Sequence, residues 1–234
     1  MGIYDRKFFS SHAALSYASA QRIVPLITAL IHPRSVVDVG CGTGSWLRVF
    51  REKGITEILG IDGDYVQKEQ LEIPASAFMT ADLERPLSIG RVFDLAISLE
   101  VAEHLDQRQA EAFIFSLVAL SPAIIFSAAV PGQGGTSHKN EQWPEYWRQI
   151  FKRHGYVVTD PIRMEVWDDG EIAWWYAQNI FVYVREDALE RFPALEKYRA
   201  KTARALVHPK LLQKSRMSLP QKISRALRNM FQHS

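Results

Sequence analysis

The sequence predicts an α/β fold in which a mostly parallel sheet is covered by helices on both faces. Apolar runs of strand length alternate along the chain with segments whose apolar residues have helical spacing. A glycine-rich turn, G-C-G-T-G at residues 40–44, joins the first predicted strand to the next helix, and acidic residues mark three successive strands. Parallel strands connected by helices account for these observations, because ligands of open α/β sheets bind at the carboxyl ends of the strands.

The elements are expected in a regular order. Apolar spacing predicts a leading helix over 11–31, which Pro33 ends. Strands are expected at 36–39, 57–61, 77–81, 93–99, 123–129, 156–160 and 178–184; helices are expected at 45–53, 64–71 (short), 107–119, from Pro144 to Gly155, and at 187–206. The predicted organisation is a helical cap (1–34), a ligand-binding domain (35–186) and a C-terminal helix with a tail (187–234).

Composition is that of a globular protein with one domain and appendages. The chain has 234 residues, of which 47% are hydrophobic and 23% charged. A single cysteine, Cys41, excludes an intramolecular disulfide and suits a reducing compartment. No signal-like apolar core opens the sequence, and no run of about 18 consecutive apolar residues occurs. A cytoplasmic protein is therefore expected.

Charge is distributed unevenly although the formal net charge is only +2. Of the 28 basic side chains, ten lie between Lys197 and Ser234, a segment without Asp or Glu, so the preceding residues carry 18 basic against 26 acidic groups. Within this tail, apolar residues share one helical face: Ile223, Leu227, Met230 and Phe231. Such a basic amphipathic helix could lie on an anionic membrane surface, at the inner face. A solvated tail, or a helix packed on the acidic body, is the alternative.

The glycine turn indicates a nucleotide-type pocket, because glycines permit positive φ and let a ligand approach the main chain. Asp38 stands two positions before the first glycine. A dinucleotide fold would require G-x-G-x-x-G, whose third glycine packs helix on strand. The turn here is one residue tighter, which disfavours a nicotinamide-dependent oxidoreductase.

The segments after the turn follow a recognisable order. A second strand ends in Asp62, a third carries Asp82 followed by Leu83, and a fourth leads into E-V-A-E-H-L at 100–105. Together, over about residues 35–185, they resemble the motifs of the class I S-adenosylmethionine (SAM) methyltransferases. The resemblance implies a Rossmann-like, seven-stranded, mostly parallel sheet sandwiched by helices, with the final strand antiparallel, and SAM as cofactor.

The resemblance also assigns the cofactor residues. Asp62 would hold the ribose, and Asp82 with Leu83 would flank the adenine. The expected cofactor-binding set is Asp38, Gly40, Cys41, Gly42, Thr43, Gly44, Trp46, Asp62, Asp82, Leu83, Leu99 and Glu100. Any one of these acids could equally be an ordinary strand-end or helix-capping residue, so the prediction depends on their occurrence at one edge of the sheet.

The segment 131–147 is predicted to be a lid over the substrate, since it is long, polar and rich in aromatic residues. The expected substrate-binding residues are Gln133, Asn140, Gln142, Trp143, Tyr146 and Trp147. Aromatic faces stack on sugars and neutral amides hydrogen-bond to them, although the same aromatics could be core residues. The run H-x-N-E-Q-W-P-x-Y-W resembles bacterial methyltransferases associated with surface-glycan loci. A hydroxyl of a sugar, glycan or glycolipid is therefore the expected acceptor.

Two histidines are candidate catalytic residues. SAM carries an activated methyl group, so the protein must align the acceptor, and a general base helps a hydroxyl to attack. The resemblance places the residue matching His104 beside the cofactor, whereas His138 lies in the loop after the fifth strand. His138 is the expected base, with a solvent-facing loop histidine as the alternative.

Glu100, Glu103 and His104 share one face at helical spacing, and with His138 they could bind a divalent cation. This set resembles the metal-dependent small-RNA 2′-O-methyltransferases, yet the same E-x-x-E-H segment occurs in metal-free methyltransferases. The acidic body also lacks the basic surface that RNA requires. We therefore expect no metal and no nucleic-acid partner. A metal-dependent RNA methyltransferase and a non-catalytic SAM-binding protein remain alternatives, and the sequence makes no prediction of oligomeric state.

Overall fold

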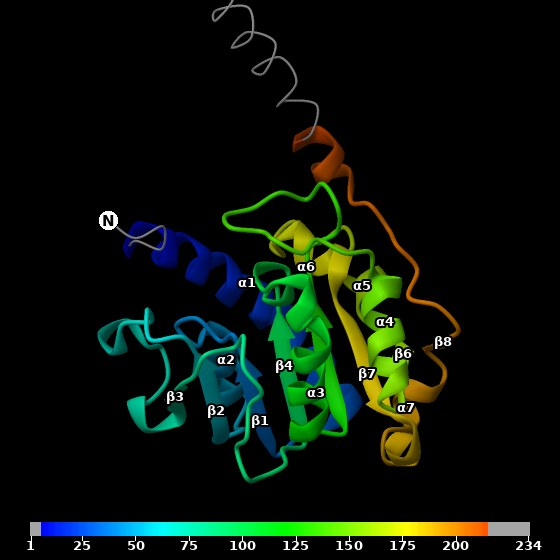
Figure 1. The fold of residues 1–234 in the computed structure, drawn as a ribbon, viewed down its shortest axis with the longest axis horizontal. Coiled ribbons are helices and arrows are strands. Elements are labelled where there is room, and N and C mark those ends of the chain that lie inside the picture. The colour runs from blue at the N-terminus through cyan, green and yellow to red at the C-terminus, as the bar shows by residue number, and fades with distance from the viewer. Residues whose placement is uncertain (1–5, 215–234) are drawn as a thin grey trace, which may run out of the picture.

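The computed structural model describes residues 6–214, and the side chains from residue 13 onward. Its centre is one eight-stranded sheet of order β3-β2-β1-β4-β5-β7-β6-β8 (Figure 1). The strands are β1 (Ser35–Val39), β2 (Glu57–Asp62), β3 (Phe78–Thr80), β4 (Leu95–Leu99), β5 (Ala123–Ser127), β6 (Tyr156–Thr159), β7 (Phe181–Arg185) and β8 (Arg199–Ala200). The α/β fold predicted from the sequence is confirmed.

Strands β1 to β5 are mutually parallel, and β7 inserts antiparallel between β5 and β6. The prediction of seven strands is wrong by one, because β8 adds an antiparallel edge strand to β6, with Val158 opposite Ala200. The helix predicted over 187–206 is also wrong. That segment forms a 3-10 helix (η5, Glu186–Arg191), a short helix α7 (Pro193–Glu196) and β8, because Pro193 interrupts helical hydrogen bonding and the open edge of β6 offers unpaired backbone groups.

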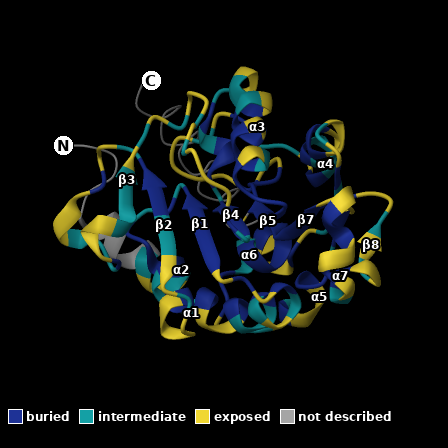
Figure 2. Cartoon of the chain, turned by 90° about the horizontal axis from the view of Figure 1, so that it is seen from below, coloured by how far each residue is buried: buried dark blue, intermediate teal, exposed yellow. Residues whose placement is uncertain are grey.

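Helices form one layer on each side of the sheet (Figure 2). The helices on one side are α1 (Arg6–Ile31), α2 (Ser45–Glu52), α5 (Arg163–Val166) and α6 (Trp174–Asn179); those on the other are α3 (Ala110–Leu120) and α4 (Pro144–Arg153). Alternate residues of a strand enter different cores: Val36 packs with α1 and α2, whereas Val37 packs with α3. Strands buried on both faces read as continuous apolar runs, which is why the sequence shows them so clearly.

Helix α1 confirms the predicted leading helix and begins earlier, at Arg6. Residues Ala13–Ile31 are long enough, with a mean hydropathy of 1.3, to pass as a membrane span by length and composition. Ile23, Val24 and Ile27 are fully buried in the core shared with α2. Packing against the domain thus accounts for the apolar side of this helix.

In place of the short helix predicted at 64–71, the structure has one 3-10 turn, η1 (Lys68–Gln70), and a second, η2 (Ala75–Ala77), follows before β3. The segment stays extended because Glu72 hydrogen-bonds across to the start of α2. Its amide donates to the Thr43 carbonyl at 2.8 Å, and its carboxylate accepts from the Ser45 hydroxyl at 2.6 Å. Tertiary contacts therefore override the local helical pattern.

The C-terminal part of the described chain returns to the carboxyl ends of the strands (Figure 1). The His208 amide donates to Gln178 Oε1 at 2.8 Å, and Lys214 Nζ donates to the Gln133 carbonyl at 2.9 Å. The amphipathic helix predicted around residues 220–231 lies outside the described residues.

Candidate active site

The glycine turn after β1 forms the floor of the site. The amides of Gly40 and Cys41 donate to the Ile61 carbonyl at 2.8 and 3.2 Å, which curls the chain over the end of β2. Gly40 has φ +84°, and a Cβ there would lie 2.3 Å from Val101 Cγ2, so a side chain is excluded. Gly42, at φ +54°, has no atom within 4 Å of the corresponding position. The main chain is therefore open to a ligand at Gly42.

Asp62, the last residue of β2, ties this turn to its neighbours. Its Oδ2 accepts from the Gly42 amide at 2.6 Å, and its Oδ1 accepts from the Gly63 amide at 2.7 Å and from the Tyr65 hydroxyl. An ionised carboxylate can accept about four hydrogen bonds, so capacity remains for a ligand hydroxyl. Asp62, the predicted ribose acid, thus lies at the wall of a cavity.

Two cavities adjoin at this edge of the sheet. The first, about 710 Å³, lies beside the ends of β2 and β3; the second, about 640 Å³, lies between the glycine turn, α1, the loop after β5 and α6. Both are lined by Gly40, Gly42, Glu100 and His104. A bipartite ligand could therefore place one half in each cavity and its centre near Glu100.

Most of the predicted cofactor residues line these cavities. Asp62, Asp82 and Leu83 line the first cavity; Asp38, Cys41, Thr43, Trp46 and Leu99 line the second. Gly44 lines neither. A Cβ on Gly44, where φ is +88°, would lie 2.9 Å from Ile73 Cγ1. Its absent side chain therefore makes room for Ile73, and the prediction that Gly44 contacts the cofactor is not supported by its position.

Three buried carboxyl groups, Asp38, Asp62 and Glu103, gather around the cavities with the half-buried Glu100. None of them forms an ion pair within residues 6–214. Burial raises the pKa of Asp38 well above its usual range, with repulsion from Asp62 adding to it, and burial raises the pKa of Glu100 to about 6. Uncompensated carboxylates favour a cationic ligand, which would relieve their repulsion.

Glu100 is held in an unusual conformation at the junction of the cavities. Its φ is +57°, in the left-handed region, and its carboxylate accepts from Gln133 Nε2 at 2.7 Å and from Asn179 Nδ2 at 3.1 Å. Gln178 Nε2 in turn donates to Gln133 Oε1 at 3.3 Å. Gln133, predicted to bind substrate, does line the second cavity, but its amide is engaged with Glu100.

An aromatic wall lines the second cavity, and only Trp46 among its residues belongs to the predicted cofactor-binding set. It comprises Trp46 together with Trp174, Trp175 and Tyr176 of α6. The Trp46 and Tyr176 rings meet edge to face with centroids 5.2 Å apart, and the Tyr176 hydroxyl lies 3.1 Å from Ser16 Oγ of α1. The W-W-Y run itself was the signal available in the sequence, but it is equally typical of core packing.

The second half of the predicted lid lies outside both cavities, which corrects the assignment of five substrate residues. Trp147 is only 2% exposed and packs against Phe126 with ring centroids 5.3 Å apart. The remaining four do not reach the cavities: Asn140 and Gln142 bond to each other, Tyr146 packs on Trp147, and Trp143 is 45% exposed. Pro144 begins α4 here, and the apolar face of that helix must pack on the sheet.

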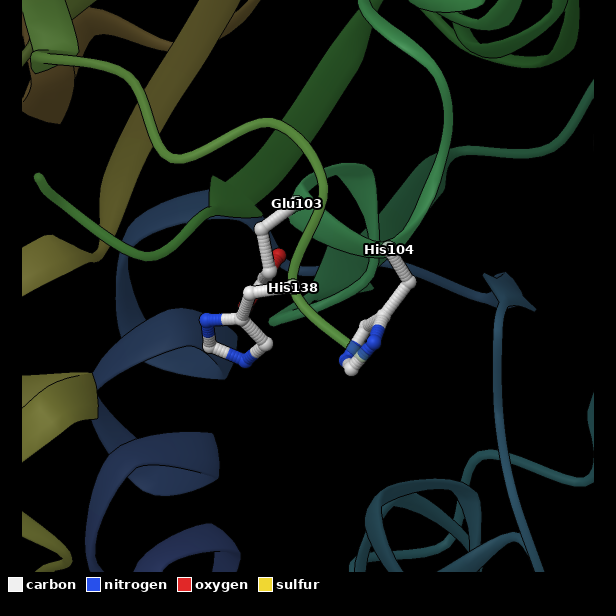
Figure 3. Close-up of side chains that lie close together, drawn as sticks. All are labelled: Glu103, His104 and His138. Carbon is white, nitrogen blue, oxygen red and sulfur yellow. The ribbon is translucent and has the colours of Figure 1, made fainter. Parts of the chain in front are cut away.

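The two predicted catalytic histidines are brought together at the cavity. His104 ends a 3-10 turn after β4 (η3, Ala102–His104), and its ring meets that of His138 edge to face with centroids 4.9 Å apart. Figure 3 shows both rings projecting from their loops beside the Glu103 carboxyl. Burial lowers the pKa of His104 to about 4, and the charge of His138 adds to this. His104 is therefore neutral at pH 7.

Glu103, His104 and His138 also form a potential metal-binding group, with one ligand atom from each lying within 4.8 Å of the others. Neither carboxyl oxygen of Glu103 has a hydrogen-bond partner among the described residues. Glu100, the fourth ligand of the predicted alternative, is instead bound to amides of Gln133 and Asn179. The donor set can accept a cation, but it is smaller than the sequence pattern suggested.

The open parallel sheet, the antiparallel β7 between β5 and β6, the glycine turn and the acid that ends β2 define the class I SAM-dependent methyltransferases. A family model described as a methyltransferase domain matches residues 11–178. The chain belongs to this methyltransferase family.

Individual relatives agree with this membership. Over 138 residues the chain is 30% identical to a malonyl-[acyl-carrier protein] O-methyltransferase of Salmonella typhimurium, an alignment that covers 58% of this chain and 53% of the relative. The chain spans about half the length of the first curated relatives that it matches.

Solved structures share the fold. SAM-bound CalS10, an amino pentose methyltransferase from Micromonospora echinaspora, superposes with a TM-score of 0.57 at 14% identity, covering 79% of this chain and 99% of that one. The methyltransferase domain of the bacterial protein CtHen1 gives a TM-score of 0.53 at 20% identity, covering 72% and 98%.

SAM is the cofactor of this domain, and the described residues fit it. The glycine turn exposes its main chain at Gly42, and the uncompensated carboxylates suit a ligand with a positive sulfonium. When bound, SAM supplies a methyl group already activated for transfer. The domain is thus a SAM-dependent methyltransferase, as the sequence predicted.

Proposed function

We propose that the domain transfers the methyl group of SAM to a hydroxyl of a polar, uncharged acceptor, a sugar unit of a glycan or glycolipid. The observation that supports this acceptor is the wall of the second cavity. Trp174 and Trp175 are partly exposed there, and partly exposed aromatic faces next to neutral polar groups suit a sugar ring. CalS10, whose fold is similar, acts on an amino pentose.

In this proposal the first cavity receives the adenosine part of SAM. Asp62 accepts hydrogen bonds from the ribose, and Leu83 and Asp82 flank the adenine. The sulfonium then lies near Glu100, where the two cavities meet. The acceptor enters the second cavity and faces the methyl group. In this arrangement the adenosine occupies the first cavity and the acceptor the second, and the Glu100 carboxylate lies beside the positive sulfonium.

His138 is the proposed general base. It lines the second cavity with a side chain only 13% exposed, so it is not an ordinary solvent-facing histidine. His104, neutral beside it, lines both cavities and is proposed to contact the cofactor and to exclude water. No step of this proposal requires a metal ion.

Replacement of His138 by alanine tests its role. Removal of a general base is expected to slow methyl transfer by about 10²-fold or more, while the dissociation constant for SAM stays within about twofold. Rapid-quench measurement of transfer, paired with calorimetric titration of SAM, separates the two effects. An unchanged transfer rate would eliminate His138 as the base.

The acceptor is identified by transfer of labelled methyl from SAM into an extract of the source organism, fractionated into glycan, lipid, nucleic acid and protein. Label in the glycan or glycolipid fraction, unchanged by chelator, is the expected result. Label confined to protein or to small acids would reject the sugar acceptor, even if the enzyme is active.

A second candidate is a metal-dependent RNA 2′-O-methyltransferase, favoured by the proximity of Glu103, His104 and His138. It predicts chelator-sensitive label in the RNA fraction and restoration by Mg²⁺ or Mn²⁺. A non-catalytic SAM-binding protein would bind SAM and transfer no label to any fraction.

Location is also a proposal. We place the protein in the cytoplasm, with peripheral contact at the inner membrane face through the basic residues after Lys197. Sedimentation of the full chain with anionic and with neutral vesicles measures this contact, and equal binding to both would contradict it.

A further inference from the structure

The first part of the loop after β5 folds around a single carboxylate, that of Glu141. Its Oε2 accepts from the Gly132 amide at 2.8 Å, and its Oε1 accepts from the Gly134 amide at 2.7 Å. The same Oε1 lies 2.9 Å from Nδ1 of His138. One acid thus connects both ends of the loop to the proposed base.

The backbone of this loop is shaped to present its amides to the carboxylate. Gly132 and Gly134 have φ of +84° and +62°, and Ser137, just before His138, has φ +60°. Glycines at positive φ turn alternate amides toward one side of the chain, which creates an anion-binding concavity. A non-glycine residue at positive φ is strained, so the conformation next to His138 is held by the contacts of the loop.

The ring of His138 is confined on its other side as well. A Cβ on Gly135 would lie 2.2 Å from Nε2 of His138. The His138 ring therefore packs directly against Gly135, where a side chain would clash with it. The amide of Lys139 donates to the Glu103 carbonyl at 2.8 Å and fixes the chain just after the histidine. His138 lines the second cavity, and because Nδ1 contacts Glu141, Nε2 is the ring nitrogen left for a ligand.

Both carboxyl oxygens of Glu141 accept hydrogen bonds from backbone amides, as an ionised carboxylate does. A carboxylate beside Nδ1 requires that this nitrogen carry the proton.

We propose that Glu141 is a positioning residue, which holds His138 in the tautomer with the proton on Nδ1 and the lone pair of Nε2 directed to the acceptor. This inference rests on the proposed function of His138 as base. In the transfer step, Nε2 takes the proton of the acceptor hydroxyl while the O–CH₃ bond forms and the S–CH₃ bond breaks. Neutral S-adenosylhomocysteine leaves, and the carboxylate of Glu141 balances the charge of the imidazolium until its proton passes to water.

The test combines kinetics with a direct view of the ring. Glu141→Gln is expected to slow methyl transfer by about 10–100-fold, as for other residues that orient a ligating or reacting histidine, while the dissociation constant for SAM changes less than twofold. Glu141→Gln combined with His138→Ala should be no slower than His138→Ala alone. Glu111→Gln is the matched control, because that exposed glutamate pairs with Arg153, at 3.2 Å, away from both cavities, and its loss should leave transfer unchanged.

Nitrogen-15 NMR of the imidazole ring distinguishes positioning from a purely structural role. The wild-type protein with SAM should show a protonated Nδ1 on His138, assigned by its loss in His138→Ala, and Glu141→Ala should shift the ring toward the other tautomer. A protonated Nε2 in the wild-type protein overturns the inference, as does a double variant that loses the full product of both single effects.

The two readouts also separate this inference from the proposed function. The tautomer is measured without any acceptor, so it tests Glu141 even if the sugar assignment fails. If His138→Ala transfers methyl at the normal rate while the tautomer follows Glu141, the base assignment is wrong and the positioning contact stands.

Discussion

Glu100 occupies the point where the two cavities meet, and its environment explains its importance. It is half-buried, it has a positive φ, and its carboxylate accepts from the neutral amides of Gln133 and Asn179. A buried anion without a counter-ion is costly, and here the pKa of Glu100 rises to about 6 mainly because of burial. The bound sulfonium would supply the missing positive charge.

This electrostatic account predicts the pH dependence of SAM binding. In the ligand-free protein Glu100 is protonated below pH 6, whereas the cationic cofactor favours the ionised form. SAM affinity should therefore fall as pH drops, by about tenfold between pH 7.5 and pH 5 for this one group.

Calorimetric titration at both pH values measures it, with S-adenosylhomocysteine as the matched control, since that ligand lacks the sulfonium charge. An equal loss of affinity for both ligands would contradict the role of the carboxylates.

At the scale of elements, the parallel strands and the glycine turn could be predicted because they depend on local pattern and on burial of both sheet faces. The lid could be predicted only in part. Gln133 and His138 line the cavity, but Trp147 packs on Phe126, and an aromatic run reads the same in a binding wall and in a core. Whether an aromatic residue faces a cavity or the core depends on which element packs against it, and the local sequence does not identify that element.

The same limit explains the errors in the other elements. Glu72 keeps its segment extended by bonding to the start of α2, and β8 forms because β6 leaves an open edge. Both are long-range contacts that outweigh helical spacing. Gly44 was read as a ligand-contacting glycine, whereas the structure shows that it accommodates Ile73.

The wall formed by α6 yields a prediction with an internal control. Trp174→Ala should raise the KM for the acceptor by about 3–10-fold, which corresponds to the loss of one aromatic stacking contact, and leave the dissociation constant for SAM unchanged. Trp143→Ala, an exposed tryptophan outside both cavities, should change neither. Equal effects of the two substitutions would show that the acceptor does not use the second cavity as proposed.

For the whole molecule, the chain after β8 completes the site. His208 and Leu211 are buried, and Lys214 bonds to the carbonyls of Gln133 and Gly134 at 2.9 and 3.1 Å. These contacts of residues 208–214 assign this part of the C-terminal segment to the domain.

Two truncations test this division. A chain that ends at residue 214 should keep its thermal stability and SAM affinity. A chain that ends at residue 206 should lose about 2–4 kcal/mol of folding free energy, from the burial of Leu211 and the hydrogen bond to Gln178, and should transfer methyl more slowly. Chemical unfolding measures the difference, and equal stability of the two chains would contradict it.

The account as a whole depends on SAM binding at the carboxyl ends of the strands, and titration of SAM into the wild-type protein and into Asp62→Ala tests this most directly. The wild-type protein should bind SAM, and the variant should bind more weakly by about 1–3 kcal/mol, because it loses hydrogen bonds to the ribose. Asp62→Asn, which keeps one acceptor oxygen for the turn, controls for local distortion. Absence of SAM binding by the folded wild-type protein, or equal affinity in Asp62→Ala, would contradict the account.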